Sequence, residues 1–307
     1  MNWLRQYVIT AGVPGQEGFE ISSLGNNRPL HVNFELEKAD TQSSNTGKLQ
    51  ISNLSAAHKA ILGQDGCMVE IKAGYTDAVS SLFLGSVSNP TETLSGADRT
   101  LELELIDGFS NYDAVGSMSI NDVVTADMVL TEFQAQMGVE SVIITEQAAA
   151  LLATAKYGNG YCYVGRLKAG LQALVAKAGL SFSMQNGVLQ VFYPGEAITT
   201  QAYVLSADTG LISIPKKITI SESSTSKTGT KKTKSESSGS SESGKSDSGI
   251  PGYEVEYFIN GAIGINDLVK VESKNLTGVF RVKKQTYRGD NYSGDWTCTA
   301  QLVEVTA

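Results

Sequence analysis

Residues 30–62 read LHVNFELEKADTQSSNTGKLQISNLSAAHKAIL, and this stretch decides which class of fold the chain can adopt. Over residues 30–37 apolar and polar residues alternate one by one, which predicts a strand with one buried face. Residues 40–47 are rich in Asp, Ser, Asn, Thr and Gly, which favour turns. The alternation resumes over residues 48–52, and a serine then precedes a short apolar helix. The stretch therefore predicts a hairpin followed by a helix, and its residues are those of a scaffold.

The remainder of residues 1–114 repeats this strand pattern. Leu101, Leu103 and Leu105 alternate with glutamates in the clearest half-buried strand of the chain. Several short strands joined by polar turns are typical of a small barrel or sandwich. We therefore predict an N-terminal antiparallel β-barrel domain over residues 1–114.

The period of the pattern changes over residues 115–193. Apolar residues at three- and four-residue spacing predict one helix that ends at Gly138 and a second that ends at Gly179. The buried face of the first helix is predicted to hold Val123, Ala126, Leu130, Phe133 and Met137. The Asn186–Gly187 pair predicts a two-residue type I′ turn between two strands. A helix packed on a hairpin makes a small α+β domain.

Strands return over residues 194–307. Short strands are predicted at Ala202–Leu205, Leu211–Ile214 and Lys217–Ile220. In the last strand the alternation places on one face Trp296, Cys298, Ala300 and Leu302. Residues 221–249 are mostly Ser, Lys, Gly, Thr and Glu, and such a segment buries too little apolar surface to offset its ordering entropy. We predict a C-terminal β domain interrupted by a flexible insertion.

The charge and the cysteines limit the function classes. The formal net charge of −8 argues against a nucleic-acid-binding protein, because phosphate binding needs clustered Lys and Arg. Cys67, Cys162 and Cys298 lie far apart with no CxxC spacing, so we expect reduced thiols. No window approaches the ~20 apolar residues of a membrane span, and the first residues lack a signal-peptide pattern. We expect a soluble chain assembled in a cytoplasm.

No catalytic, cofactor-binding or metal site is predicted. His31 and His58 are the only imidazoles, and without a nucleophile-elbow motif both are expected on the surface. Residues 289–295 carry oxygen side chains at alternating positions, as a Ca²⁺ loop does, but they lack its distal Glu, so a turn between strands is favoured. The glycines of residues 158–165 match no phosphate-binding spacing.

Five stretches resemble the baseplate hub proteins of tailed bacteriophages, also called tail hub or late-control proteins. They are NTGKLQISNLS with VEIKAGY (residues 45–55 and 69–75), GADRTLELELIDG (96–108), YCYVGRLKAGLQALVAKAGLSFSMQNGVLQVF (161–192) and GINDLVKVESKNLTGVFRVKKQTYRGDNYSGDW (264–296). They follow the same order as in that family. The resemblance rests on structural residues, so it carries no catalytic site with it.

The resemblance implies a mainly β fold with two tail-tube-like barrels and an α+β insert, and a structural protein that is not an enzyme. It implies a homotrimer whose six barrels form a ring around the DNA channel, joining the tail tube to the central spike. The implied partners are the tail tube or a tail-terminal adaptor protein, the spike and other baseplate proteins, with transient passage of DNA and no cofactor. The implied location is the virion tail, after assembly in the host cytoplasm.

Two other functions stay open at this point. A hub-associated cell-wall hydrolase would need two carboxylates at a set separation across a cleft. A carbohydrate-binding or adhesin module would use exposed Tyr and Trp side chains on its strands to stack on sugars.

Overall fold

The computed structural model describes residues 4–25, 28–75, 78–107, 112–220 and 249–305. The predicted insertion, residues 221–249, lies outside the described residues except for Gly249.

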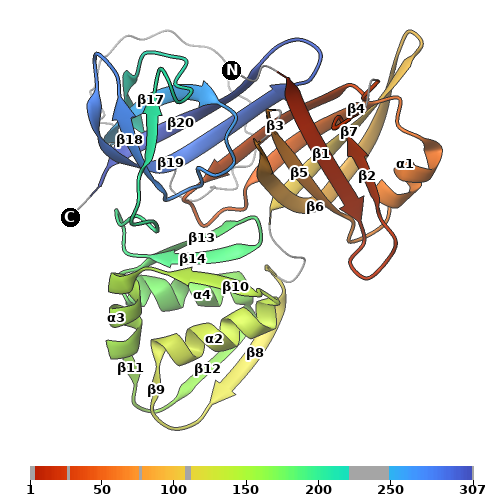
Figure 1. Cartoon of the computed structure of the whole chain (residues 1–307). Coiled ribbons are helices and arrows are strands. Elements are labelled where there is room, and N and C mark those ends of the chain that lie inside the picture. The colour runs from red at the N-terminus through yellow and green to blue at the C-terminus, as the bar shows by residue number, and fades with distance from the viewer. Residues whose placement is uncertain (1–3, 26–27, 76–77, 108–111, 221–248, 306–307) are drawn as a thin grey trace, which may run out of the picture.

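Most strands belong to one sheet (Figure 1). Its path runs β16 (Lys216–Ile220), β17 (Ile250–Phe258), β20 (Trp296–Glu304), β19 (Thr277–Asp290), β3 (Val32–Ala39), β4 (Thr46–Ser52), β7 (Asp98–Asp107), β6 (Ala78–Ser95), β5 (Met68–Tyr75), β1 (Arg5–Gly12) and β2 (Phe19–Ser22). Off this path, β18 (Leu268–Glu272) pairs with β19, and β15 (Tyr203–Ser206) pairs with β18. We call β1–β7 and β15–β20 together the strand body.

The two halves of the strand body join through β3 and β19. These strands pair antiparallel, from Lys284 opposite Ala39 to Asp290 opposite Asn33. Strand β3 is the first strand of the β3–β4 hairpin, and β19 is the first strand of the β19–β20 hairpin. The two hairpins therefore lie side by side and pair through their first strands. Antiparallel pairing of equivalent strands gives this part of the sheet a local approximate two-fold symmetry.

The mainly β class with an α+β insert is confirmed. Among the described residues, however, no ladder closes either predicted barrel, since the path is open between β16 and β2. In the N-terminal half both edges of β3 are occupied, by β4 and by β19, so β3 cannot also pair with β2 to close a barrel. The predicted domain boundaries at 114/115 and 193/194 stay a prediction.

One apolar core fills the strand body. Period-two alternation puts the apolar side chains of both halves on its inner face, and Leu103, Leu105, Cys298 and Leu302 are all 1% exposed or less. The predicted inward row of β20 is confirmed, since Trp296 and Ala300 are buried in the same cluster. The N-terminal and C-terminal strands therefore share a single core. At its edge lies α1 (Ala56–Leu62), whose N-cap Ser55 accepts the N–H of His58.

A second core lies in residues 112–193, which we call the α+β unit. It contains β8 (Val115–Ile120), β9 (Val124–Thr125), α2 (Ala126–Met137), β10 (Ser141–Ile144), α3 (Glu146–Thr154), β11 (Lys156–Tyr157), β12 (Tyr161–Arg166), α4 (Leu167–Lys177), β13 (Ser181–Gln185) and β14 (Val188–Phe192). The sheet β10–β14–β13 meets the strand body through its β13–β14 hairpin, and the helices lie on the other side (Figure 1).

Turn and helix signals in the α+β unit are mostly confirmed. Gly138 and Gly179 follow α2 and α4 with φ of 68° and 73°, and Asn186 and Gly187 both have positive φ, as a type I′ turn needs. Val123 was wrongly assigned to the first helix: it is 63% exposed and precedes β9, because the helix begins only at Ala126.

Two further expectations need correction. Residues 211–214 form no strand, and only an isolated bridge joins Leu211 to Tyr257, because this segment turns back beside β17. Helix α3 and the β8–β12 ribbon were not predicted, although the Ala- and Leu-rich residues of α3 favour a helix.

Candidate functional site: the acidic face of the central sheet

The outward face of the central strands is polar from β17 across to β7. We call it the acidic face. Away from the strand ends it carries six carboxylates, Glu35, Glu37, Glu102, Glu104, Glu254 and Glu256, and three cations, Lys48, Lys284 and Arg288, none of them buried. Carboxylates therefore outnumber cations two to one on this face.

Strand register explains why these charges gather. Residues opposite each other in neighbouring strands point to the same face, so one row reads Arg288, Glu35, Lys48 and Glu104 across four strands. The buried leucines alternate with these residues on the opposite face. The alternation that builds the core thus also builds this surface.

Two of the three cations on the acidic face are engaged in ion pairs. Arg288 Nη2 lies 2.9 Å from Glu35 Oε1, and Lys284 Nζ lies 3.2 Å from Glu37 Oε2. These side chains are 38–51% exposed, so each pair contributes little to stability. The cations are thus partly neutralised by the neighbouring carboxylates. Such a surface repels phosphate groups and offers them no clustered Lys or Arg.

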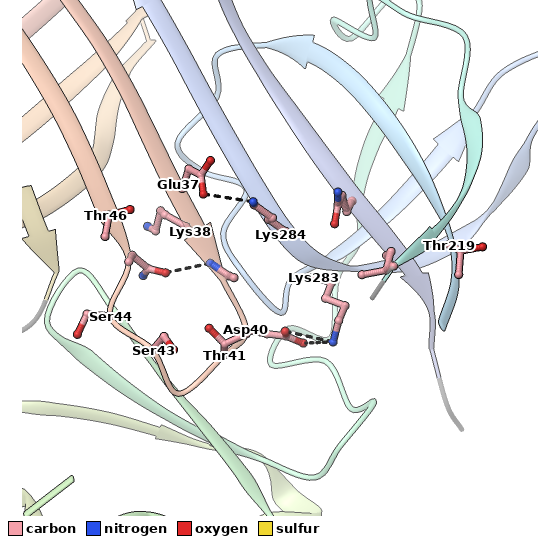
Figure 2. A pocket seen from close by; sticks show the side chains of 14 residues that line it. Glu37, Lys38, Asp40, Thr41, Ser43, Ser44, Thr46, Thr219, Lys283 and Lys284 are labelled. Atoms are coloured by element: carbon pink, nitrogen blue, oxygen red, sulfur yellow. Dashed lines mark hydrogen bonds and ion pairs between the residues drawn. The ribbon is translucent and has the colours of Figure 1, made fainter. Parts of the chain in front are cut away.

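A pocket of about 490 Å³ opens beside the acidic face, between the β3–β4 turn and strands β16 and β19 (Figure 2). Its acids are already paired: Glu37 with Lys284, and Asp40 with Lys283, whose Nζ lies 3.3 Å from Asp40 Oδ1. Hydroxyls of Thr41, Ser43 and other residues complete the lining. A pair of free carboxylates of the kind that glycoside hydrolysis uses is not present in this pocket.

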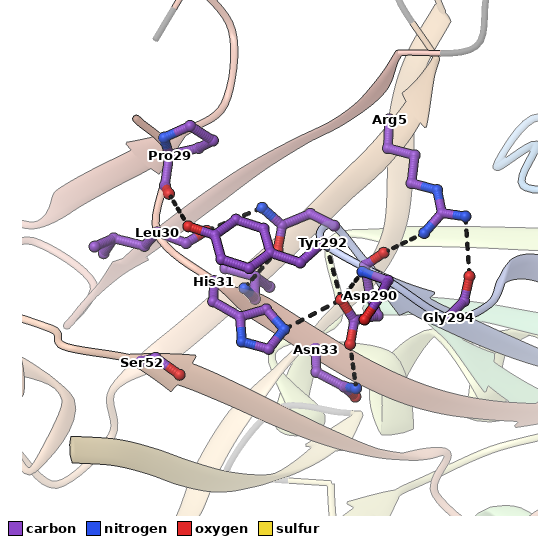
Figure 3. A network of polar contacts seen from close by, with 12 residues as sticks. Arg5, Pro29, Leu30, His31, Asn33, Ser52, Asp290, Tyr292 and Gly294 are labelled. Carbon is purple, nitrogen blue, oxygen red and sulfur yellow. Dashed lines mark hydrogen bonds and ion pairs between the residues drawn. The ribbon is translucent and has the colours of Figure 1, made fainter. Parts of the chain in front are cut away.

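The 289–295 segment is a turn held by Asp290 (Figure 3). Asp290 Oδ1 accepts the N–H groups of Tyr292 and Ser293 at 2.8 and 3.0 Å, and His31 Nε2 lies 3.1 Å from the same oxygen. Burial tends to raise the pKa of Asp290, but these two N–H donors and His31 outweigh it and lower the pKa. The carboxylate that would head a Ca²⁺ loop is thus occupied in closing the turn.

The two histidines pack against aromatic rings. His31 is half-buried and stacks on Tyr292 at 4.7 Å between ring centroids, and His58 stacks on Phe19 at 4.1 Å. His31 therefore ties the start of β3 to the β19–β20 turn, whereas the sequence predicted an outward-facing surface side chain. Each histidine has a structural partner.

The three cysteines are free thiols in this structure. Cys67 and Cys298 are buried and Cys162 is exposed. Burial raises the pKa of Cys298 to about 12, so this thiol is unreactive. Within the described residues, no three His, Cys, Asp or Glu side chains gather as a metal ion would need, and no helix is long and apolar enough to cross a membrane.

Sequence reasoning missed a set of buried polar residues where the α+β unit meets the strand body. We call this contact the polar seam. Its buried members are Asn45, Asp107, Gln185, Gln190, Asn266 and Arg281. They come from segments far apart in the sequence, and the only local signal was the Asn186–Gly187 turn that lies among them.

Comparisons with solved structures place this fold among phage tail proteins. The chain resembles a tail protein from Neisseria meningitidis MC58, with a TM-score of 0.60 and 11% identity over 97% of this chain and 96% of that one. The 43 kDa tail protein of prophage MuSo2 from Shewanella oneidensis gives a TM-score of 0.58 and 10% identity over 97% of this chain and 98% of that one.

A third similar structure comes from a secretion machine. It is an Escherichia coli component of the type VI secretion system, described as structurally similar to the T4 bacteriophage tail proteins gp27 and gp5. Its TM-score is 0.57 at 10% identity, over 92% of this chain and 76% of that one. No protein-family profile and no curated protein sequence matches the chain.

The chain therefore has the fold of phage tail proteins, and the resemblance seen in the sequence is confirmed at the level of the fold. At identities near 10% the likeness concerns the fold alone.

Proposed function

We propose that this protein is the structural hub of a phage tail baseplate. Three copies would form a ring that joins the tail tube to the central spike and surrounds the DNA channel. The partners would be the tail tube or a tail-terminal adaptor protein, the spike, and other baseplate proteins. The protein would reside in the virion tail after assembly in the host cytoplasm, and it would act without catalysis.

One observation carries the proposal: the two strand halves are joined as approximate equivalents through β3 and β19. A trimer of chains with two such units each presents six similar units around its axis. A ring of this kind can meet a six-fold tube on one side and a three-fold spike on the other. Closed point-group symmetry is the rule for homo-oligomers, and a three-fold ring satisfies it.

The acidic face supports the channel part of the proposal. DNA moving through a tail must not adhere, and a wall on which carboxylates outnumber cations two to one repels its phosphates. The face is continuous across the β3–β19 joint, so one chain would line the channel with both of its units. The similar structures support a role in a phage tail, because two of them are described as tail proteins and one as a secretion-system component resembling tail proteins.

The test is the solution mass of the purified full chain, alone and mixed with its neighbouring spike candidate, by light scattering. We expect a trimer, or a monomer that becomes a trimer on adding the spike. A chain that stays monomeric under both conditions would contradict the hub. A monomer that binds a glycan panel would favour the adhesin module, and hydrolysis of purified cell walls, abolished by a single Asp or Glu substitution, would favour the hydrolase.

A further inference from the structure

We propose that the β13–β14 hairpin is a latch: its tip fixes the orientation of the α+β unit on the strand body, and it can open while both apolar cores stay folded. This inference concerns the chain itself and does not depend on the tail role.

Hydrogen bonds hold the tip of the hairpin on the strand body. The backbone N–H groups of Asn186 and Gly187 donate to Asp107 Oδ2 and Oδ1 at 2.9 and 3.3 Å. Asn186 Oδ1 accepts the N–H of Leu84 at 3.2 Å, and Gln185 Nε2 donates to the carbonyl of Ala39 at 2.8 Å. Three consecutive residues thus reach three different strands of the strand body.

Asp107 is the centre of the latch. Besides the two backbone donors, its Oδ2 accepts Asn45 Nδ2 at 2.8 Å. The Asn45 amide cannot turn over, because its Oδ1 accepts the N–H of Ala39 at 2.9 Å. Asn45 Nδ2 also donates to Met184 O and Gln185 Oε1 at 2.9 and 3.0 Å. Every group that faces Asp107 in this set is a donor, so only a side chain with two acceptor oxygens satisfies them all.

The latch can open separately because the two cores do not merge. The strand body and the α+β unit form distinct apolar clusters, and the residues of the tip make hydrogen bonds to the strand body. Polar groups released from such an interface regain hydrogen bonds from water, whereas exposing a shared apolar core would cost much more. Contacts between domains of this polar kind permit relative motion.

A second contact would hold the two parts together when the tip is released. Asn266 Nδ2 donates to Gln190 Oε1 at 2.9 Å, and Asn266 Oδ1 accepts Arg281 Nη1. Arg281 Nη1 also lies 2.8 Å from Asp40 Oδ2. This cluster contacts β14 away from the tip, so it would serve as the pivot of the motion.

The test is native-state amide hydrogen exchange on the full-length Asp107→Asn variant. An amide at 107 presents an N–H₂ group to at least one of the three donors, so the tip should loosen. We expect the amides of Leu84, Asn186 and Gly187 to exchange at least about tenfold faster, while those of Leu103 in β7 and Phe133 in α2 keep their protection.

The matched control is Asp267→Asn. Asp267 is also buried, but its Oδ2 accepts only the nearby N–H of Gly264. This variant should leave the exchange of the tip amides unchanged. The proposal is overturned if tip and core amides of Asp107→Asn accelerate together, or if the control loosens the tip equally.

A second variant covers the case in which Asp107→Asn does not fold. Asn186→Gly keeps the positive φ of the turn but removes the side-chain contact to Leu84. A spin label on the exposed Cys162, paired with one on Thr91→Cys at an exposed position of β6, reports the orientation of the α+β unit. We expect a broader distance distribution with Asn186→Gly, and an unchanged narrow distribution would contradict the latch.

Discussion

At the residue scale, the carboxylate of Asp290 holds together segments that lie far apart in the sequence. Asp290 accepts two backbone donors of its own turn and also contacts His31, some 260 positions earlier in the chain. Arg5 also binds this turn, which we call the Asp290 corner, since its Nη1 donates to the carbonyl of Asp290 at 2.6 Å. The corner therefore ties β1, the start of β3 and the β19–β20 turn to one another.

Asp290→Ala should destabilise the protein in a pH-dependent way. Because the pKa of Asp290 is lowered in the folded state, its carboxylate stabilises the fold at pH values above the unfolded pKa of about 4. This contribution is lost as the pH falls through the folded pKa. We expect a loss of about 1–3 kcal/mol in the free energy of unfolding at pH 7, shrinking below about pH 4.

Urea unfolding at pH 7 and pH 3 measures this difference. Asp295→Ala is the control, because Asp295 is exposed in the same turn and contributes only its backbone carbonyl to the Asp290 N–H. An equal loss at both pH values would show that the charge of Asp290 does not matter.

At the element scale, α2 and α4 are each followed by a glycine in the left-handed region. Gly179 ends α4 with φ of 73°, and the amides of Gly179 and Leu180 bond back to the carbonyls of Ala176 and Val175 at 3.0 and 2.9 Å. The sequence predicted this end correctly, because Gly follows the last apolar position of the stripe. Helix ends are local features, and local signals suffice to find them.

Gly179→Ala should destabilise α4 by about 1 kcal/mol, because an L-residue at this φ is strained. No atom lies within 4 Å of the position a Cβ would take, so the loss reports backbone strain alone. Gly158→Ala is the matched control, since that site is equally open and lies outside the left-handed region. Thermal unfolding of both variants measures the difference, and equal midpoints would contradict the assignment.

At the scale of the whole molecule, one core serves both strand halves. Sequence patterns predicted two barrels, but Leu103 and Leu302 belong to the same apolar cluster, and the sheet is continuous between them. The two halves should therefore unfold as a single cooperative unit.

Leu103→Ala and Leu302→Ala should each lower the free energy of unfolding of the same transition by about 2–5 kcal/mol. Trp296 of β20 packs on Phe34 and donates its Nε1–H to the carbonyl of Gly74, so in a Trp3→Phe background its fluorescence reports the contact between the two halves. If Leu103→Ala left the Trp296 transition in place, the halves would be independent domains, as the sequence predicted.

The sequence by itself determined most of the strands, three of the four helices in the described residues and the turn at Asn186–Gly187. These follow from periods of two and of 3.6 and from turn residues, all of which act within a few positions. Only the tertiary structure decided that β3 pairs with β19, that the charges form one acidic face, and that Asp107 meets the tip of a distant hairpin. The physical reason is that the alternation of apolar and polar residues indicates which face of a strand is buried, but it does not indicate which strand pairs with it.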